Sequence, residues 1–210
     1  MKQLQEEFES NLQQLDIKVE LRENIMSKAA EVLDYIDTEK DISKDTLLQK
    51  MSIILIAPTF DPIQNDILQS DKIQLISNSR LRRMLGNWPS YVTELKEQET
   101  EWVNLYSGYT APYLIDIWLS RDLNIYFFDD PRNLNYLMDK SNSPRINLKP
   151  SKNTPSVKEI LNDVKLEGIL SSAILINVGV NVESQSLRSK ILDILESRDS
   201  EIVTKENPNL

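Results

Sequence analysis

The sequence predicts an all-α fold, an elongated helical bundle in which long N- and C-terminal helices pack together with shorter helices between them. Glycine is scarce, with 4 residues in 210, and long stretches contain neither glycine nor proline. Apolar residues recur in alternating steps of four and three near both ends of the chain, which is the spacing of a helical seam. The best strand-like window, residues 123–128 (LNIYFF), is short. We expect residues 1–210 to form one helical domain.

The composition narrows the possible chemistry. The chain has no cysteine and no histidine, which removes disulfides, thiolate zinc sites and the commonest general base. The formal net charge of −9 opposes a phosphate backbone, so we expect no nucleic-acid partner. There is no GxGxxG, P-loop or GxSxG motif, and we assign no catalytic residue, metal or cofactor. No apolar run approaches the roughly 20 residues of a membrane span, and the acidic N-terminus is no signal peptide.

The first predicted helix runs from Lys2 to about Asp37. Its seam consists of Phe8, Leu12, Leu15, Val19, Arg22, Met26, Ala29, Leu33 and Ile36, so Arg22 alone breaks the apolar series. Ser43 is predicted to cap a second helix from Lys44 to Ile56. Pro58 ends that helix, because the residue before a proline avoids the α region.

The middle of the chain carries the densest turn signals. Asp61 and Pro62 predict the start of a short helix that reaches Leu68. Residues 77–79 (SNS) predict the cap of a further helix, whose seam is Leu81, Leu85, Trp88, Val92, Leu95, Glu99, Trp102 and Tyr106. Pro89 lies inside this run, and we expect a break or kink there. A helical turn is expected again after Pro131.

The last third of the chain begins with a proline-rich segment. Residues 141–156 (SNSPRINLKPSKNTPS) predict an exposed loop. We expect one long helix from Val157 to about Ser197, followed by a frayed tail over 201–210. Its seam is Leu166, Leu170, Ala173, Asn177, Val180, Ser184, Leu187, Ile191 and Ile194.

The seams of the two terminal helices suggest a buried polar layer. Arg22 is central in the first seam, and Asn177 and Ser184 are central in the last. A buried arginine needs partners, which Asn177, Ser184 and the neighbouring Glu183 would supply. We expect this layer to fix the register of the bundle, so that Arg22→Leu leaves the fold intact and loosens register or oligomeric state.

Residues from about 4 to 120 resemble an uncharacterised bacterial domain-of-unknown-function family, most clearly within 58–102. The likeness rests on PTFDP at 58–62, SDKIQLI at 70–76, NSRLR at 78–82 and Trp88. Family members typically carry one N-terminal transmembrane helix just before the segment that matches Lys2–Asp37. The resemblance implies an extracytoplasmic helical domain on the periplasmic face of the inner membrane, attached only through such an anchor, which this sequence lacks. Without an anchor in the native protein, we expect a cytoplasmic location.

Two groups of side chains are candidates for a ligand or partner site. The aromatic residues Trp88, Trp102, Tyr106, Tyr109 and Trp118 would line a cleft, although rings at helical spacing more often belong to the core. Arg80 and Arg83 stand near the start of a helix, where basic charge opposes the helix dipole. They would bind an anion or an acidic partner, unless nearby carboxylates pair with them in the acidic background.

Two functions stay open from the sequence. The first is a non-enzymatic interaction or sensory module of the bacterial envelope, with a protein partner or self-association through Ile17, Leu21, Ile25 and Val32. The second is a small-molecule binder or carboxylate-dependent enzyme that uses the aromatic and acidic region 88–130. A binder would expose several of the aromatic rings in a pocket, whereas an interaction module would bury them and leave an apolar patch on a long helix.

Overall fold

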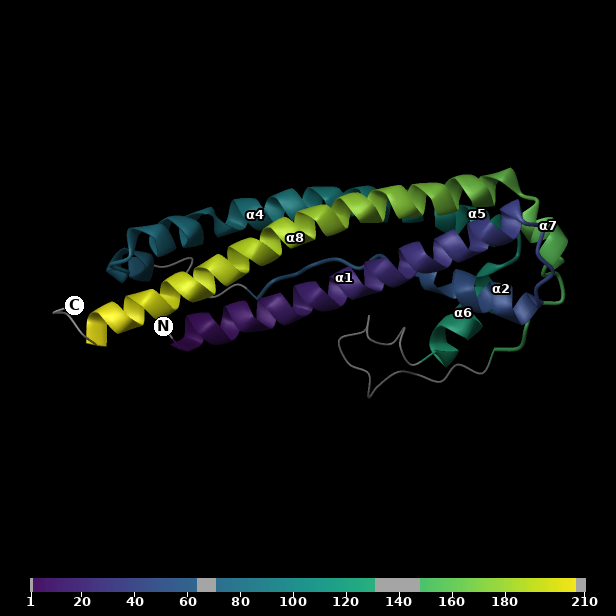
Figure 1. Cartoon of the computed structure of the whole chain (residues 1–210). Coiled ribbons are helices and arrows are strands. Elements are labelled where there is room, and N and C mark those ends of the chain that lie inside the picture. The colour runs from purple at the N-terminus through teal and green to yellow at the C-terminus, as the bar shows by residue number, and fades with distance from the viewer. Residues whose placement is uncertain (1, 64–70, 131–147, 207–210) are drawn as a thin grey trace. The chain divides into compact units, whose positions relative to one another are not determined.

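The computed structural model describes residues 2–63, 71–130 and 148–206. Within these ranges all regular secondary structure is helical, and no β-strand is present (Figure 1). This confirms the all-α fold class. The helices are α1 (Lys2–Asp37), α2 (Lys44–Ser52), α4 (Ser79–Leu105), α5 (Ala111–Asp116), α6 (Ser120–Asp129), α7 (Val157–Leu161) and α8 (Val164–Glu206). Shorter turns are the 3₁₀ turns η1 (Ile53–Leu55) and η2 (Asp71–Leu75), and the π-helical turn η3 (Tyr106–Thr110).

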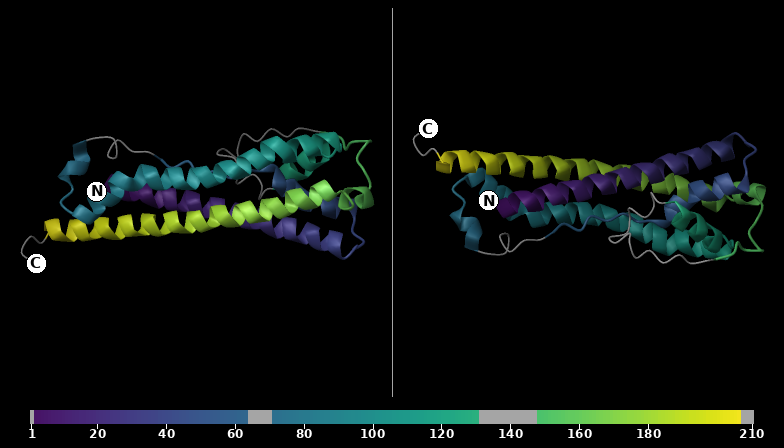
Figure 2. Two further views of the ribbon diagram at one scale, coloured as in Figure 1. Left: turned by 90° about the horizontal axis from the view of Figure 1, so that it is seen from above. Right: turned by 90° about the horizontal axis from the view of Figure 1, so that it is seen from below.

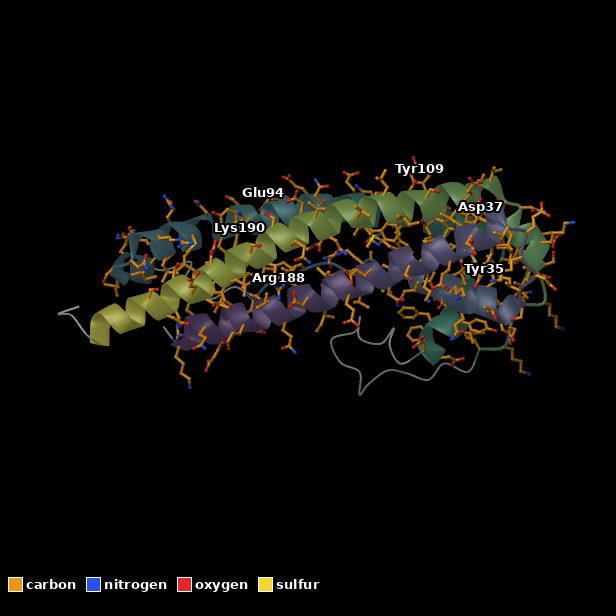
Figure 3. The ribbon with its side chains drawn as sticks, viewed as in Figure 1. Tyr35, Asp37, Glu94, Tyr109, Arg188 and Lys190 are labelled. Atoms are coloured by element: carbon orange, nitrogen blue, oxygen red, sulfur yellow. The ribbon has the colours of Figure 1, made fainter. Side chains whose placement is uncertain are left out.

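The chain divides into two compact units. Unit 1 comprises Met1–Glu20, Thr59–Gln98 and Val180–Leu210, and unit 2 comprises Leu21–Pro58 and Glu99–Gly179. The predicted pairing of the first and last helices occurs inside each of them. In unit 1, Asn181 donates to the Val19 carbonyl at 3.5 Å, and Arg188 pairs with Asp16 at 2.9 Å. Because the higher number on α8 meets the lower number on α1, the two helices are antiparallel there (Figure 2; Arg188 is labelled in Figure 3).

Unit 1 is held together by apolar seams and by polar contacts to the 59–63 segment. Phe8 meets Trp88 edge-on, with ring centroids 4.8 Å apart. The side-chain amide of Asn11 accepts a hydrogen bond from the Ile63 amide at 2.8 Å and donates one to the Ile63 carbonyl at 3.3 Å. The side-chain amide of Gln14 likewise accepts from the Asp61 amide and donates to the Asp61 carbonyl, both at 3.0 Å. Two amide side chains of α1 therefore satisfy the backbone of a segment that has no regular structure of its own.

Unit 2 has an apolar core built from both halves of its sequence. Leu21, Ile25 and Ala29 of α1 pack in one cluster with Leu166 and Ala173 of α8. Helices α2 and α6 pack against one another in this unit, and the Tyr126 hydroxyl donates to Asp45 at 2.5 Å. Trp102 contributes its ring to the same cluster and its indole N–H to the Ile56 carbonyl, 3.1 Å away.

Two helix starts follow the predicted capping chemistry. Ser43 accepts from the Thr46 amide at 3.1 Å, as predicted for the start of α2. Asn78 accepts from the amides of Arg80 and Leu81, at 3.0 and 3.1 Å, at the start of α4. Helix α2 is shorter than predicted, because η1 replaces its last turn before Pro58. The helix predicted over 61–68 and the turn after Pro131 fall mostly outside the described residues.

Two expectations about helix continuity were wrong, namely a break at Pro89 and one uninterrupted helix from Val157. Pro89 does not break α4, which continues from Ser79 to Leu105. The strand-like window 123–128 lies within helix α6, where Leu123 and Phe127 are buried four residues apart. The single helix from Val157 is interrupted at Asn162–Asp163, and Asp163 starts α8 by accepting from the Lys165 amide at 2.9 Å.

The ends of the last segment also differ from expectation. Helix α8 continues to Glu206, so the predicted frayed tail over 201–210 is helical in its first six residues. In the predicted loop 141–156, the described part from 148 onward has no helix, but it is held by hydrogen bonds to a buried carboxylate. Asp122 of α6 accepts from the Ser151 amide at 2.7 Å and from the Thr154 hydroxyl.

One helix in the described part of the chain, Val164–Ser200 within α8, is long and apolar enough to cross a membrane by length and composition alone. In the structure, 33% of its most apolar window is buried. The expectation that no segment would suit a membrane span therefore fails by this measure. Burial in the two units accounts for part of that apolar character, since Leu170 and Ala173 belong to the core of unit 2 and Leu187 is buried in unit 1.

Candidate functional site

Unit 2 contains a groove with a volume of about 690 Å³ between the α4–α5 connection and the start of α8. This volume lies in the roughly 300–1,000 Å³ range of small-molecule sites. One wall is formed by Leu105, Gly108, Tyr109, Pro112, Tyr113, Asp116 and Ile117, and the other by Asp163, Lys165, Gly168, Ile169 and Ser172.

The first wall is shaped by the π-helical turn η3. Proline at 112 has no amide to continue the α-helical ladder, and the widened turn precedes it. The Ala111 amide donates to the Tyr106 carbonyl, and the Thr110 hydroxyl donates to the Leu105 carbonyl at 3.4 Å. Single π-helical turns recur at functional sites, because the extra residue changes the direction of the side chains that follow.

The second wall depends on the interruption between α7 and α8. Asp163 uses one carboxylate oxygen to cap α8 and the other to accept from the Tyr113 hydroxyl at 3.1 Å. Burial raises the pKa of Tyr113, and the charge and hydrogen bond of Asp163 raise it further. Tyr113 is therefore a neutral donor at physiological pH, and its bond joins the two walls.

The groove combines apolar surface with few charges. Tyr109 leaves 70% of its surface exposed (Figure 3). Two carboxylates, Asp116 and Asp163, face one ammonium group, Lys165, among the lining residues. Gly108 and Gly168 add room, because a Cβ atom at either position would meet nothing within 4 Å.

A smaller cavity of about 290 Å³ adjoins the groove and shares Ile117 and Asp163 with it. Trp118 lines this cavity with 61% of its surface exposed and a backbone φ of 63°. The Trp118 amide bonds the Ile115 carbonyl at 3.1 Å, and the Leu119 amide bonds the Leu114 carbonyl at 3.0 Å. These bonds form a Schellman motif at the end of α5, in which the left-handed position usually belongs to glycine.

The predicted aromatic site divides between core and surface. Trp88 and Trp102 are buried, with 2% and 1% of their surface exposed, and neither lines the groove. Tyr106 is half-buried inside η3. Tyr109 and Trp118 line the two cavities. The core interpretation is therefore correct for the first two rings, and the cleft interpretation for the last two.

The predicted arginine pair lies at the surface of unit 1. Arg80 forms an ion pair with Asp193 at 3.1 Å, with 56% and 47% of the two side chains exposed. Arg83 is also exposed on α4. A carboxylate therefore pairs with Arg80, which agrees with the expectation that nearby carboxylates would neutralise these arginines.

The predicted polar layer is buried, but its partners differ. Arg22 is fully buried in unit 2 and donates to Glu99 at 3.0 Å and to the Pro58 carbonyl at 3.2 Å. Burial lowers the pKa of Arg22, while the charge of Glu99 opposes that change. Asn177 is buried in the same unit but donates to the Ala173 carbonyl at 2.8 Å. The sequence-based pairing of Arg22 with Asn177 was wrong, and Glu99 takes that role.

The other two members of the predicted layer belong to unit 1. Ser184 is buried and donates to the Val180 carbonyl at 2.8 Å. Glu183 is half-buried. Glu99 is the charged member of the α4 seam, so the opposite charges in two seams were a signal that could have identified the pair.

The proposed self-association stripe on α1 is not available as a surface. Leu21, Ile25 and Val32 are buried in the core of unit 2, and only Ile17 is exposed. Apolar residues are exposed instead on α8, where Leu175 and Val178 of unit 2 leave 73% and 47% of their surfaces uncovered.

Asp163, Lys165 and Gly168 of the second wall were not predicted from the sequence. Asn162–Asp163 before an apolar periodic run is a cap signal, and it could have divided the last helix and located one wall.

A search of protein-family models gave no match to this chain, and comparisons with curated proteins and with solved structures gave none either.

Proposed function

We propose that this protein is a non-enzymatic binding module, of the interaction or sensory type, that takes a small, largely apolar ligand in the groove of unit 2. The observation that carries the proposal is the groove itself, about 690 Å³ between η3–α5 and α8. Apolar walls with a few fixed polar groups are typical of ligand sites. The Tyr113–Asp163 bond supports a preformed site, because it joins the two walls without a ligand.

The alternative, a carboxylate-dependent enzyme, has less support. Asp163 already accepts hydrogen bonds at both carboxylate oxygens, from Tyr113 and from the Lys165 amide. A general base needs a free oxygen within reach of the proton that it abstracts. Binding therefore accounts for these contacts better than catalysis.

The place of action is a second part of the proposal. We infer a role in the bacterial envelope from the resemblance of residues 58–102 to the family described above. Membrane fractionation of the native cells, with mass spectrometry of the intact N-terminus, tests this part. Recovery in the soluble fraction with a start at Met1 would remove it and leave the groove proposal unaffected.

Amide NMR with n-hexanol as a neutral apolar probe tests the groove. The chain has four glycines; Gly108 and Gly168 line the groove, whereas Gly86 and Gly179 do not. We expect n-hexanol to shift the amide signals of Gly108 and Gly168 and to leave those of Gly86 and Gly179 unchanged.

A matched pair of variants completes the test. Gly168→Leu should fill the groove and abolish the shift at Gly108, because its side chain starts in open space. Gly86→Leu, at an exposed position on α4 of unit 1, should leave the shift unchanged. Uniform small shifts at all four glycines would contradict the proposal.

A further inference from the structure

We propose that the natural ligand of this groove is a small organic cation, an apolar body that carries one positively charged nitrogen. This inference rests on the proposed binding function and specifies the chemical class of its ligand. It combines the charges of the groove with the exposed tryptophan of the adjoining cavity.

The charges of the lining residues favour a cation. Asp116 and Asp163 supply two negative charges against the single positive charge of Lys165. The hydrogen bonds from Tyr113 and from the Lys165 amide hold the negative charge of Asp163 in a fixed position at the groove. Asp116 is exposed on α5, and the carboxylate is thus accessible to a ligand. A carboxylate-bearing ligand would meet a net like charge at this site.

The aromatic side chains also favour a cation. Trp118 and Tyr109 are both mostly exposed, one in each of the two adjoining cavities. The face of an aromatic ring attracts cations, and tryptophan does so most strongly. Aromatic rings together with carboxylates are the groups that recognise organic ammonium ions.

The backbone at Trp118 is an independent reason to assign this residue a binding role. A left-handed conformation is unfavourable for a residue with a side chain, and the Schellman position at the end of α5 would suit glycine. The exposed ring gains little burial in return. Strain of this kind, kept at a surface next to a cavity, is characteristic of functional sites.

The experiment compares n-hexylammonium, n-hexanol and n-hexanoate, which share a chain length and differ in charge. Binding is followed through the Gly108 and Gly168 amides and through tryptophan fluorescence. Trp118 is the exposed tryptophan, since Trp88 and Trp102 are buried. We expect n-hexylammonium to bind about fivefold more tightly than n-hexanol, as one exposed ion pair of about 1 kcal/mol would give, and n-hexanoate to bind most weakly.

Variants identify the groups responsible. Asp116→Asn should reduce the preference for n-hexylammonium over n-hexanol about threefold, while Glu94→Gln, which removes the same charge from the exposed face of α4 in unit 1 (Figure 3), should leave it unchanged. Trp118→Leu should lower the preference by a factor of about two to five, and Trp118→Phe should restore part of it.

The outcomes separate this inference from the proposed function. Equal affinities for n-hexylammonium and n-hexanol, with shifts at Gly108 and Gly168, would overturn the cation assignment and support the groove. Tighter binding of n-hexanoate would overturn the assignment too. If none of the three probes shifts those glycines, the proposed function fails and this inference fails with it.

Discussion

Arg22 is the charged residue in the seam of α1, and its partner comes from a seam about eighty residues later in the chain. The guanidinium and the Glu99 carboxylate are 3.0 Å apart, with 1% and 3% of their side chains exposed. Taking two charges out of water is costly, so such a pair contributes little net stability. Removing one partner leaves the other charge buried and is strongly destabilising.

The Arg22–Glu99 pair gives a first prediction, which revises the expectation from sequence. Arg22→Leu should lower the free energy of unfolding by about 3–5 kcal/mol, because it leaves the Glu99 carboxylate buried without the opposite charge of Arg22. The double variant Arg22→Leu/Glu99→Leu should recover most of that loss. Urea denaturation of the wild type, both single variants and the double variant gives the coupling energy. Additive effects of the two changes would contradict the assignment.

Trp118 gives a second prediction at the scale of one residue. Trp118→Gly should raise the free energy of unfolding by about 1 kcal/mol, because glycine adopts a φ of 63° without strain. Glu39→Gly is the matched control, since Glu39 is exposed with a φ of 48°. Both should stabilise the fold, but only Trp118→Gly should weaken binding of n-hexylammonium. A destabilised Trp118→Gly would show that the indole contributes packing.

Helix α4 shows how packing overrides a local signal. Pro89 lacks the amide that would bond the Leu85 carbonyl, yet the helix continues for four more turns to Leu105. Leu85, Trp88, Val92 and Leu95 are buried on both sides of the proline. Burial of that seam outweighs the loss of one hydrogen bond.

Pro89→Ala is the corresponding prediction. It should raise the free energy of unfolding by about 1–3 kcal/mol, because the new amide can bond Leu85 and the ring no longer meets the preceding turn. Pro112→Ala should change it much less, since the π-helical turn η3 just before Pro112 already accommodates the missing amide. Thermal and urea unfolding measure both. Equal effects would mean that the proline's position in its helix does not matter.

Helices α1 and α2 are linked by an ion-pair cluster that predicts a dependence on pH. Hydrogen bonds from Lys28 and Lys50 lower the pKa of Glu31 below its ordinary value of 4.5. The stability that this cluster contributes is therefore present above pH 4.5 and is lost as the pH falls through the folded-state pKa. Glu31→Gln should reduce stability at pH 7 by up to about 1 kcal/mol, since the side chains are partly exposed.

The same variant should cost less stability at pH 3 than at pH 7. Glu23→Gln, an exposed change on the same helix, serves as the control in urea titrations at both values. An equal loss for Glu31→Gln at pH 7 and pH 3 would contradict the electrostatic explanation.

The charge of the whole molecule sets the conditions under which a cation would bind. A formal net charge of −9 attracts cations over distances that salt shortens to about 10 Å at 0.1 M. Raising NaCl from about 50 to 500 mM should therefore weaken n-hexylammonium binding several-fold. Binding of n-hexanol should not weaken, and calorimetry of both probes measures the difference. An affinity for the cation that is independent of salt would contradict an electrostatic contribution.

Periodicity predicted the buried faces of two long helices closely. All nine members of the predicted α8 seam are buried, as are the members of the α4 seam from Leu81 to Trp102. On α1 the seam was less accurate, because Asn11, Ile25 and Val32 are buried and Leu12, Met26 and Leu33 only half-buried. That helix contains apolar residues on more than one face, so spacing alone could not choose among them.

The candidate site was predicted only in part. Tyr109 and Trp118 were named from the sequence, but Asp116, Asp163, Lys165 and the two glycines were not. No local pattern joins residues 105–117 to residues 163–172, which meet across the groove. Their proximity comes from packing in unit 2.

By itself, the sequence determined the helical fold class, the caps at Ser43 and Asn78 and the buried seams of α4 and α8, because these follow from interactions within a few turns of one helix. Tertiary structure decided that Glu99 partners Arg22, that α4 passes through Pro89 and that Tyr113 reaches Asp163. Each of these depends on which residues distant in sequence pack together, and the free energy of that packing exceeds any single local preference.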